Sequence, residues 1–133
     1  MSAAVRELIK SIAATTIQDG GVTYSFAKNE FITAADAWFY PQYPAITRIV
    51  PVNDLTQALS DYVDRHAELL EQNNMFLGTW MNPESKNCHL DITTCRATKE
   101  EARKEARRIN GEDSGQILAI YNPQRDTSVR LDV

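Results

Sequence analysis

The sequence has few cysteines, no long hydrophobic run and no excess of basic residues, and each lack excludes a class of protein. Two cysteines, Cys88 and Cys95, are too few for the disulfide framework of a small secreted domain. The uninterrupted apolar runs are only a few residues long, whereas a bilayer-spanning helix needs about 20. The net charge of -4 argues against a dedicated duplex-DNA-binding protein, which presents a net basic face.

Signals for secretion and for common enzyme chemistries are also absent from the sequence. The segment Met1–Glu7 lacks the basic start and apolar block of a secretory signal, so we expect a cytoplasmic protein. The sequence contains no Gly-x-Ser-x-Gly elbow and no glycine-rich phosphate loop. We therefore expect no catalytic residue, no metal and no cofactor.

What is present is an ordinary globular composition. Hydrophobic residues make up 43% of the 133 residues and charged residues 24%. These values are typical of a folded domain, and the length predicts one domain over residues 1–133. The N-terminal helix, residues 1–18, is a candidate peripheral element of that domain.

Three stretches repeat apolar residues with the period of a helix. They are residues 5–18, 55–70 and 98–110. Two of them begin with the spacing of a capping box, Asp54 with Gln57 and Thr98 with Glu101. Gly20, after Asp19, predicts the end of the first helix, because glycine permits turn geometry at little steric cost.

Strands are expected where apolar and polar residues alternate or where apolar runs lie between turns. These segments are 22–26, 31–33, 46–52, 75–81, 88–93 and 127–133. The nearly continuous apolar run Gln116–Tyr121 predicts a central strand buried on both faces. The order of elements predicts an α+β fold, with about three helices packed on a mixed, mainly antiparallel sheet.

Several short landmarks occur in a fixed order along the chain. They are Gly20–Tyr24, Tyr40–Pro44, Leu55–Leu70, Phe76–Trp80, Leu90–Thr93, Glu101–Asn110 and Ile117–Tyr121. In their order and spacing the chain resembles a loosely defined group of small accessory proteins encoded by bacteriophages and prophages. Since that group has no agreed activity, the resemblance implies a setting inside a bacterial host cell and no catalytic residues.

Aromatic residues are concentrated between Ala34 and Pro44. Because proline removes a backbone donor, Pro41 and Pro44 predict a loop or an edge segment here. The rings either close one end of the core or contact a partner, since Tyr and Trp are frequent in protein interfaces. The candidate partner-binding residues are Asp36, Trp38, Phe39, Tyr40 and Tyr43.

A second candidate surface is basic. Arg96, Lys99, Arg103 and Arg107 fall near one line of the third predicted helix and form a candidate phosphate-binding face. Glutamates at positions 100, 101 and 105 interleave with them, so a solvated, salt-bridged face is the favoured interpretation.

For three further groups of residues, a role in the fold is favoured over a role in a metal site, in catalysis or in binding. Cys88 and His89 are adjacent on a predicted strand and point to opposite faces, and the Cys88–Cys95 spacing matches no standard zinc site. A nucleophile built from Cys95 with His66 or His89 and Asp91 has nothing to fix its geometry. Trp80, with its neighbours in 75–81, is expected to pack under the second helix.

These observations favour a non-enzymatic protein that binds a host or phage protein, and an inhibitor of a bacterial defence system, such as an anti-CRISPR-like protein, is its most concrete form. A nucleic-acid-associated protein that uses helix 98–110 is the first alternative, and a small hydrolase or metal enzyme is the second. Self-association is a further hypothesis, because the last strand, ending at Val133, presents an edge that a second copy can pair with.

Overall fold

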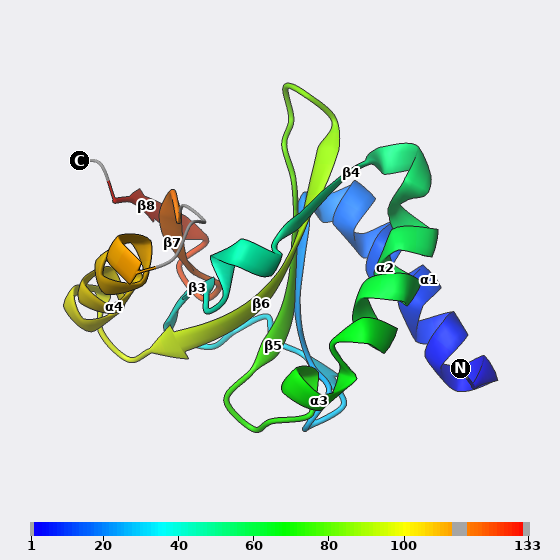
Figure 1. Ribbon diagram of the computed structural model, residues 1–133, viewed down its shortest axis with the longest axis horizontal. Helices are drawn as coiled ribbons and strands as arrows, with labels where there is room; N and C mark the ends of the chain where they lie inside the picture. Colours follow the sequence, from blue (N-terminus) through cyan, green and yellow to red (C-terminus); the bar gives the residue numbers. More distant parts are fainter. Residues whose placement is uncertain (1, 113–116, 132–133) are drawn as a thin grey trace.

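The computed structural model of the protein describes residues 2–112 and 117–131 (Figure 1). Its α-helices are α1 (Ala3–Asp19), α2 (Leu55–Arg65), α3 (Ala67–Leu70) and α4 (Lys99–Glu112). Its strands are β1 (Gly21–Ser25), β2 (Glu30–Phe31), β3 (Trp38–Pro41), β4 (Arg48–Pro51), β5 (Phe76–Met81), β6 (Asn87–Arg96), β7 (Ala119–Asn122) and β8 (Thr127–Arg130). Two 3-10 turns flank β4, η1 (Pro44–Ile46) and η2 (Val52–Asp54).

All the strands belong to one sheet. Their order is β2-β1-β5-β6-β3-β7-β8, and β4 also pairs with β6. Each of these pairs is antiparallel. The predicted α+β class is therefore confirmed.

Strand β6 lies at the centre of this sheet. One edge pairs with β5, and the other pairs first with β4 and then with β3. Successive side chains of a strand point to opposite faces, so Cys88, Leu90 and Ile92 share one face. All three are at most 1% exposed, whereas His89 and Asp91 on the other face are only partly buried.

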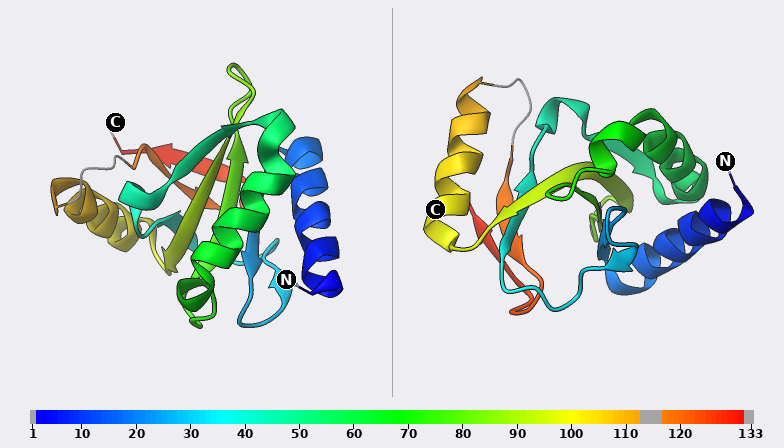
Figure 2. Two further views of the ribbon diagram at one scale, coloured as in Figure 1. Left: turned by 45° about the vertical axis from the view of Figure 1, so that its right-hand side comes forward. Right: turned by 90° about the horizontal axis from the view of Figure 1, so that it is seen from below.

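The helices cover the face that carries Leu90. Helices α1 and α2 pack side by side over β1, β5 and the first half of β6, whereas α4 packs at the other end of β6, against β3 and β7 (Figures 1 and 2). Two apolar clusters result. The first lies beneath α1 and α2 and includes Ile12, Leu59, Leu77 and Leu90, and the second lies beneath α4 and includes Trp38 and Ile120.

Helix α1 ends where the sequence predicts, and it begins at Ala3, after Ser2. Ser2 accepts a hydrogen bond from the Val5 amide at 3.2 Å, and Gly20 ends the helix with a left-handed φ of 89°. The Oγ1 atoms of Thr16 and Thr79 lie 2.6 Å apart, which joins α1 to β5 in the buried interior. The candidate peripheral helix is thus part of the core.

The segment predicted to be an aromatic loop or edge is an interior strand. Strand β3 pairs with β6 on one side and with β7 on the other. Pro41 is the last residue of the strand, so its missing amide does not interrupt the ladder. The prediction failed because proline at a strand end is compatible with a central position.

The second and third predicted helices differ in how they are capped. Thr98 accepts a hydrogen bond from the Glu101 amide at 3.2 Å, as the capping-box spacing predicts. Asp54 makes no such side-chain cap, and Gln57 donates instead to Asp61 at 3.1 Å. The second helix is also interrupted at His66, which separates α2 from α3.

The C-terminal strands form a hairpin at the edge of the sheet. The predicted central strand over 116–121 is a strand over Ala119–Asn122, and Gln116 lies outside the described residues. Its residues alternate in burial, and Leu118 is 54% exposed, so burial on both faces is wrong. Strand β8 occupies the edge as predicted, although Val133 lies outside the described residues.

No helix in the two described ranges is long and apolar enough to cross a bilayer.

Gly78, in β5, is required by close packing of the sheet. A Cβ atom there would lie 2.5 Å from Cγ2 of the buried Thr93. We expect Gly78→Ala to lower the free energy of unfolding by about 1–3 kcal/mol, measured by urea denaturation, because overpacking forces neighbours to shift.

The matched control for Gly78→Ala is Gly111→Ala. Gly111 lies in the last turn of α4, and a Cβ there has nothing within 4 Å. Alanine is the better helix former, so this variant should be unchanged or more stable by up to about 1 kcal/mol. Equal stability of Gly78→Ala and the wild type would contradict the packing argument.

Candidate binding surfaces

The aromatic segment proposed for partner binding contributes mainly to the core. Trp38 and Phe39 are each 5% exposed and Tyr40 is 1% exposed. Trp38 and Tyr40 lie in the cluster beneath α4, and Phe39 contacts Phe76 on the other face with ring centroids 5.2 Å apart. The sequence left open whether these three rings belong to the core or to an interface, and their burial places them in the core. Tyr43 is partly buried against the cluster beneath α1 and α2.

Asp36 is exposed, but its carboxylate is used inside the protein. It accepts hydrogen bonds from the Asn122 amide at 2.9 Å and from the Arg125 guanidinium at 3.2 Å. These bonds lower the pKa of Asp36, with the Asn122 bond the larger cause. The Arg125 guanidinium also lies 6.0 Å from the Trp38 ring centroid. Asp36 therefore anchors the β7–β8 turn and does not form a rim around exposed rings.

A different set of side chains is exposed on the face of the sheet opposite α1 and α2. Ile49 of β4, His89 of β6 and Trp80 of β5 lie directly opposite one another across three strands, and we call them the Trp80 row. Ile49 is 56% exposed and Trp80 47%. The Trp80 and His89 rings lie 5.1 Å apart in a tilted arrangement.

The strand next to Trp80 leaves the indole uncovered. Gly21 of β1 is the residue opposite Trp80, and it has no side chain to lie over the ring. A Cβ at position 21 would also lie 2.8 Å from the carbonyl oxygen of Thr79, so glycine is needed there for close strand pairing. The expectation that Trp80 packs under the second helix is wrong, because its register with His89 puts it on the other face.

Asp91 lies one step along β6 from the Trp80 row and on the same face. Its carboxylate accepts a hydrogen bond from the Thr47 hydroxyl. Burial raises the pKa of Asp91, and this effect outweighs the opposing effects of the Thr47 bond and of His89. An acidic group thus lies beside the apolar row.

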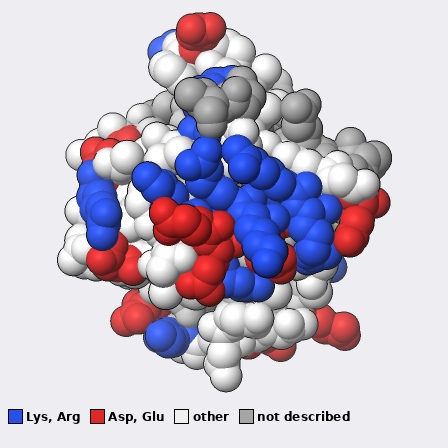
Figure 3. Space-filling model, turned by 90° about the vertical axis from the view of Figure 1, so that its left-hand side faces the viewer, with Lys and Arg blue, Asp and Glu red and all other residues white. Residues whose placement is uncertain are grey.

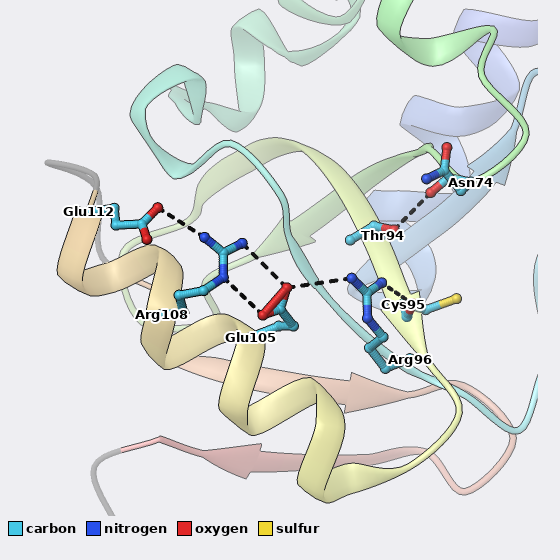
Figure 4. A network of polar contacts seen from close by, with 7 residues as sticks. All are labelled: Asn74, Thr94, Cys95, Arg96, Glu105, Arg108 and Glu112. Carbon is cyan, nitrogen blue, oxygen red and sulfur yellow. Dashed lines mark hydrogen bonds and ion pairs between the residues drawn. The ribbon is translucent and has the colours of Figure 1, made fainter.

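The basic residues of α4 are divided between two flanks of the helix. On one flank the Glu105 carboxylate binds Arg108 at 2.9 Å and Arg96 at 3.6 Å, and Arg108 also binds Glu112 at 2.9 Å (Figure 4). Arg96 is therefore separated from the line of basic residues in which the sequence put it. This flank is the salt-bridged face that the interleaved glutamates predict.

The other flank carries Lys99, Arg103 and Arg107, which are spaced by one helical turn, and we call these three residues the basic flank. Arg107 donates to the carbonyl of Leu131 at 3.1 Å, which joins the basic flank to the residue that follows β8. Figure 3 shows Lys and Arg side chains gathered on the side of the molecule where α4 and β8 lie, with acidic side chains beside them.

The cysteines and histidines are not arranged as a metal or nucleophile site. The part of the chain that the structure describes holds no group of three or more His, Cys, Asp or Glu side chains that could bind a metal. Burial raises the pKa of both Cys88 and Cys95, which disfavours the thiolate that a nucleophile requires. His66 packs against Tyr62 with ring centroids 4.6 Å apart, and His89 packs against Trp80.

Comparison with known proteins finds no matching family model, no similar curated protein and no similar solved structure.

The alternation of side chains in 88–93 is the sequence signal from which the Trp80 row could have been found. The alternation in β6 places His89 on the face opposite Cys88 and Leu90. A hairpin register that pairs Trp80 with His89 would then expose both rings. That register depends on how many residues form the turn between β5 and β6, and the Asn82–Ser85 turn signal alone leaves this open.

Asp91→Asn should change how stability depends on pH. Because the folded pKa is raised, the stabilising contribution is complete below the unfolded pKa of about 4 and is lost as pH rises through the folded pKa. Asparagine keeps an acceptor for Thr47 without the charge. We expect urea denaturation at several pH values to show higher stability than wild type at pH 7 and a weaker decline above pH 4.

The control is Asp64→Asn on the exposed surface of α2. Its free energy of unfolding should stay within about 0.5 kcal/mol of wild type at each pH. Parallel stability profiles for Asp91→Asn and the wild type would show that Asp91 is not penalised by burial.

Proposed function

We propose that the protein is a non-enzymatic binding protein that contacts another protein through the Trp80 row. The observation that carries this proposal is the exposure of Trp80 and Ile49 on the face of the sheet opposite α1 and α2. Tryptophan is among the residues that most often contribute strongly to protein–protein affinity. Ile49 and Trp80 flank His89 on neighbouring strands, and exposed apolar side chains grouped on a surface are typical of interaction sites.

The setting of the Trp80 row supports a preformed contact surface. Its three side chains come from adjacent, hydrogen-bonded strands, so the backbone beneath them is held by the sheet ladder. Little conformational entropy is then lost by the backbone on binding. The partly buried His89 supplies a polar group within the row, and Asp91 supplies one beside it.

The finer form of the proposal follows from the resemblance to phage-encoded accessory proteins. In that setting the protein acts in the cytoplasm of a bacterial host cell, and its partner is a component of a host defence system that it inhibits. The short β5–β6 hairpin and the neighbouring strand β4 would present Trp80 and Ile49 to that component. The partner's own surface would carry an apolar pocket that accepts the indole ring.

The proposal is tested by photo-cross-linking followed by a binding measurement. A photoreactive residue is placed at position 80 in one variant and at position 17 in another, since Ile17 is 50% exposed but lies on α1. A partner identified from position 80 and absent from position 17 is then purified, and its affinity is measured by calorimetry.

We expect Trp80→Ala to weaken that affinity by about 30-fold, which corresponds to a loss of about 2 kcal/mol at an interface hot spot. Ile17→Ala removes a similarly exposed side chain and should leave the affinity unchanged. Equal affinities for the two variants would rule out the Trp80 row as the contact surface. Cross-linking only to a second copy of the chain would contradict a host partner and would show that the Trp80 row mediates self-association.

A further inference from the structure

The charges of the protein are unevenly distributed along the chain. Residues 1–95 contain eleven acidic and six basic residues, whereas residues 96–133 contain seven acidic and eight basic residues. The fold brings most of the latter to the side formed by α4 and β8, which is the face that Figure 3 shows. A protein with a net charge of -4 therefore presents one strongly basic area.

The glutamates of α4 are mostly engaged away from the basic flank. Glu105 and Glu112 bind Arg96 and Arg108 on the opposite flank, and the Glu101 carboxylate contacts the Thr98 hydroxyl at 2.9 Å. Because these carboxylates are held by other partners, their charges are partly compensated before they can act on Lys99 or Arg107. These contacts thus engage three of the four glutamates of α4, whereas Glu100, four residues before Lys104, lies beside the basic flank.

Within the described residues, neither Lys99 nor Arg107 forms an ion pair with a carboxylate, and Lys104 beside them forms none either. The bond from Arg107 to the Leu131 carbonyl uses one nitrogen and fixes the guanidinium at the surface. Other donors of the guanidinium stay available, since arginine carries five N–H groups.

We infer that the basic flank binds the sugar–phosphate backbone of a nucleic acid. Lys99, Arg103 and Arg107 rise along α4 by about 6 Å per step and extend over about 12 Å. A nucleic-acid strand carries one phosphate per about 3.4 Å of helix axis, so this length faces several phosphates.

The chemistry favours phosphates over the carboxylates of an acidic protein. Two of the three side chains of the basic flank are arginines, whose planar fork matches phosphate oxygens in a bidentate geometry. The excess of acidic residues in 1–95 disfavours contact of a polyanion with the rest of the protein and favours this face. Helix α4 contains no aromatic residue that could stack on bases, so binding should depend on charge and not on base sequence.

This surface is separate from the one in the proposed function. Helix α4 follows the C-terminal end of β6, whereas Trp80 and His89 lie near the β5–β6 hairpin (Figure 1). Either surface can therefore act without the other, and Trp80→Ala should leave nucleic-acid binding unchanged.

The test is fluorescence anisotropy with a short labelled DNA duplex and the matching single strand, each at 50 and 200 mM salt. For three phosphate contacts on the duplex, the affinity should fall about 40-fold between these two salt concentrations. In the double variant Lys99→Ala/Arg107→Ala only about one contact is left, and the fall should be about 3-fold. Comparison of the two probes shows which form of nucleic acid is bound.

The matched control is Arg6→Ala/Arg65→Ala, which removes the same charge from exposed positions on α1 and α2. It should keep the wild-type salt dependence, and circular dichroism should show the same fold for both double variants. The inference is overturned if neither probe binds at 50 mM salt or if both double variants lose affinity equally. It is also overturned if a polyglutamate peptide of equal charge competes as well as unlabelled DNA, which would identify an acidic protein as the partner.

Discussion

The alternation of side chains along β6 is the constraint on which the rest of the structure depends. Cys88, Leu90 and Ile92 are buried on one face, and that face must be covered by α1 and α2. Because the period of a strand is two residues, His89 and Asp91 are then committed to the other face. Strands β3, β4 and β5 take their registers from this one strand, so the exposed position of Trp80 and Ile49 follows from it.

The same strand also connects the two apolar clusters. Its C-terminal half pairs with β3, whose Trp38 and Tyr40 meet the small residues of α4. Ala102 and Ala106 are fully buried there and let the helix approach the sheet closely. This orientation fixes which flank of α4 turns toward Arg96 and which turns toward β8.

The two proposed surfaces depend on different physics. The Trp80 row offers apolar area whose contribution to binding arises from removal of water and changes little with salt. The basic flank offers charges that attract a polyanion over about a Debye length, roughly 10 Å at 0.1 M salt, and weaken as salt is added. The glutamates that pair with Arg96 and Arg108 serve the second surface indirectly, because they keep negative charge on the other side of the helix.

Local sequence signals predicted much of the fold and little of the candidate surfaces. Gly20 and the Thr98–Glu101 pair define helix ends through bonds within a few residues, so they could be read from the sequence. The signal from Pro41 misled, because proline marks a loop or a strand end equally well, and only the neighbours β6 and β7 distinguish the two. Asp54 has the spacing of a cap without making the bond.

By itself, the sequence determined the α+β class, the C-terminal end of α1, the apolar stripe of α4 and the interleaving of charges along that helix. These properties arise from contacts between residues close in the chain and from the periods of helices and strands. Only the tertiary structure decided that Trp38, Phe39 and Tyr40 are buried, that Trp80 and Ile49 are exposed, and that Arg96 is separated from the basic flank. Each of these depends on pairing between residues distant in sequence, and such pairing is settled when the whole sheet and its helices bury their apolar surface together.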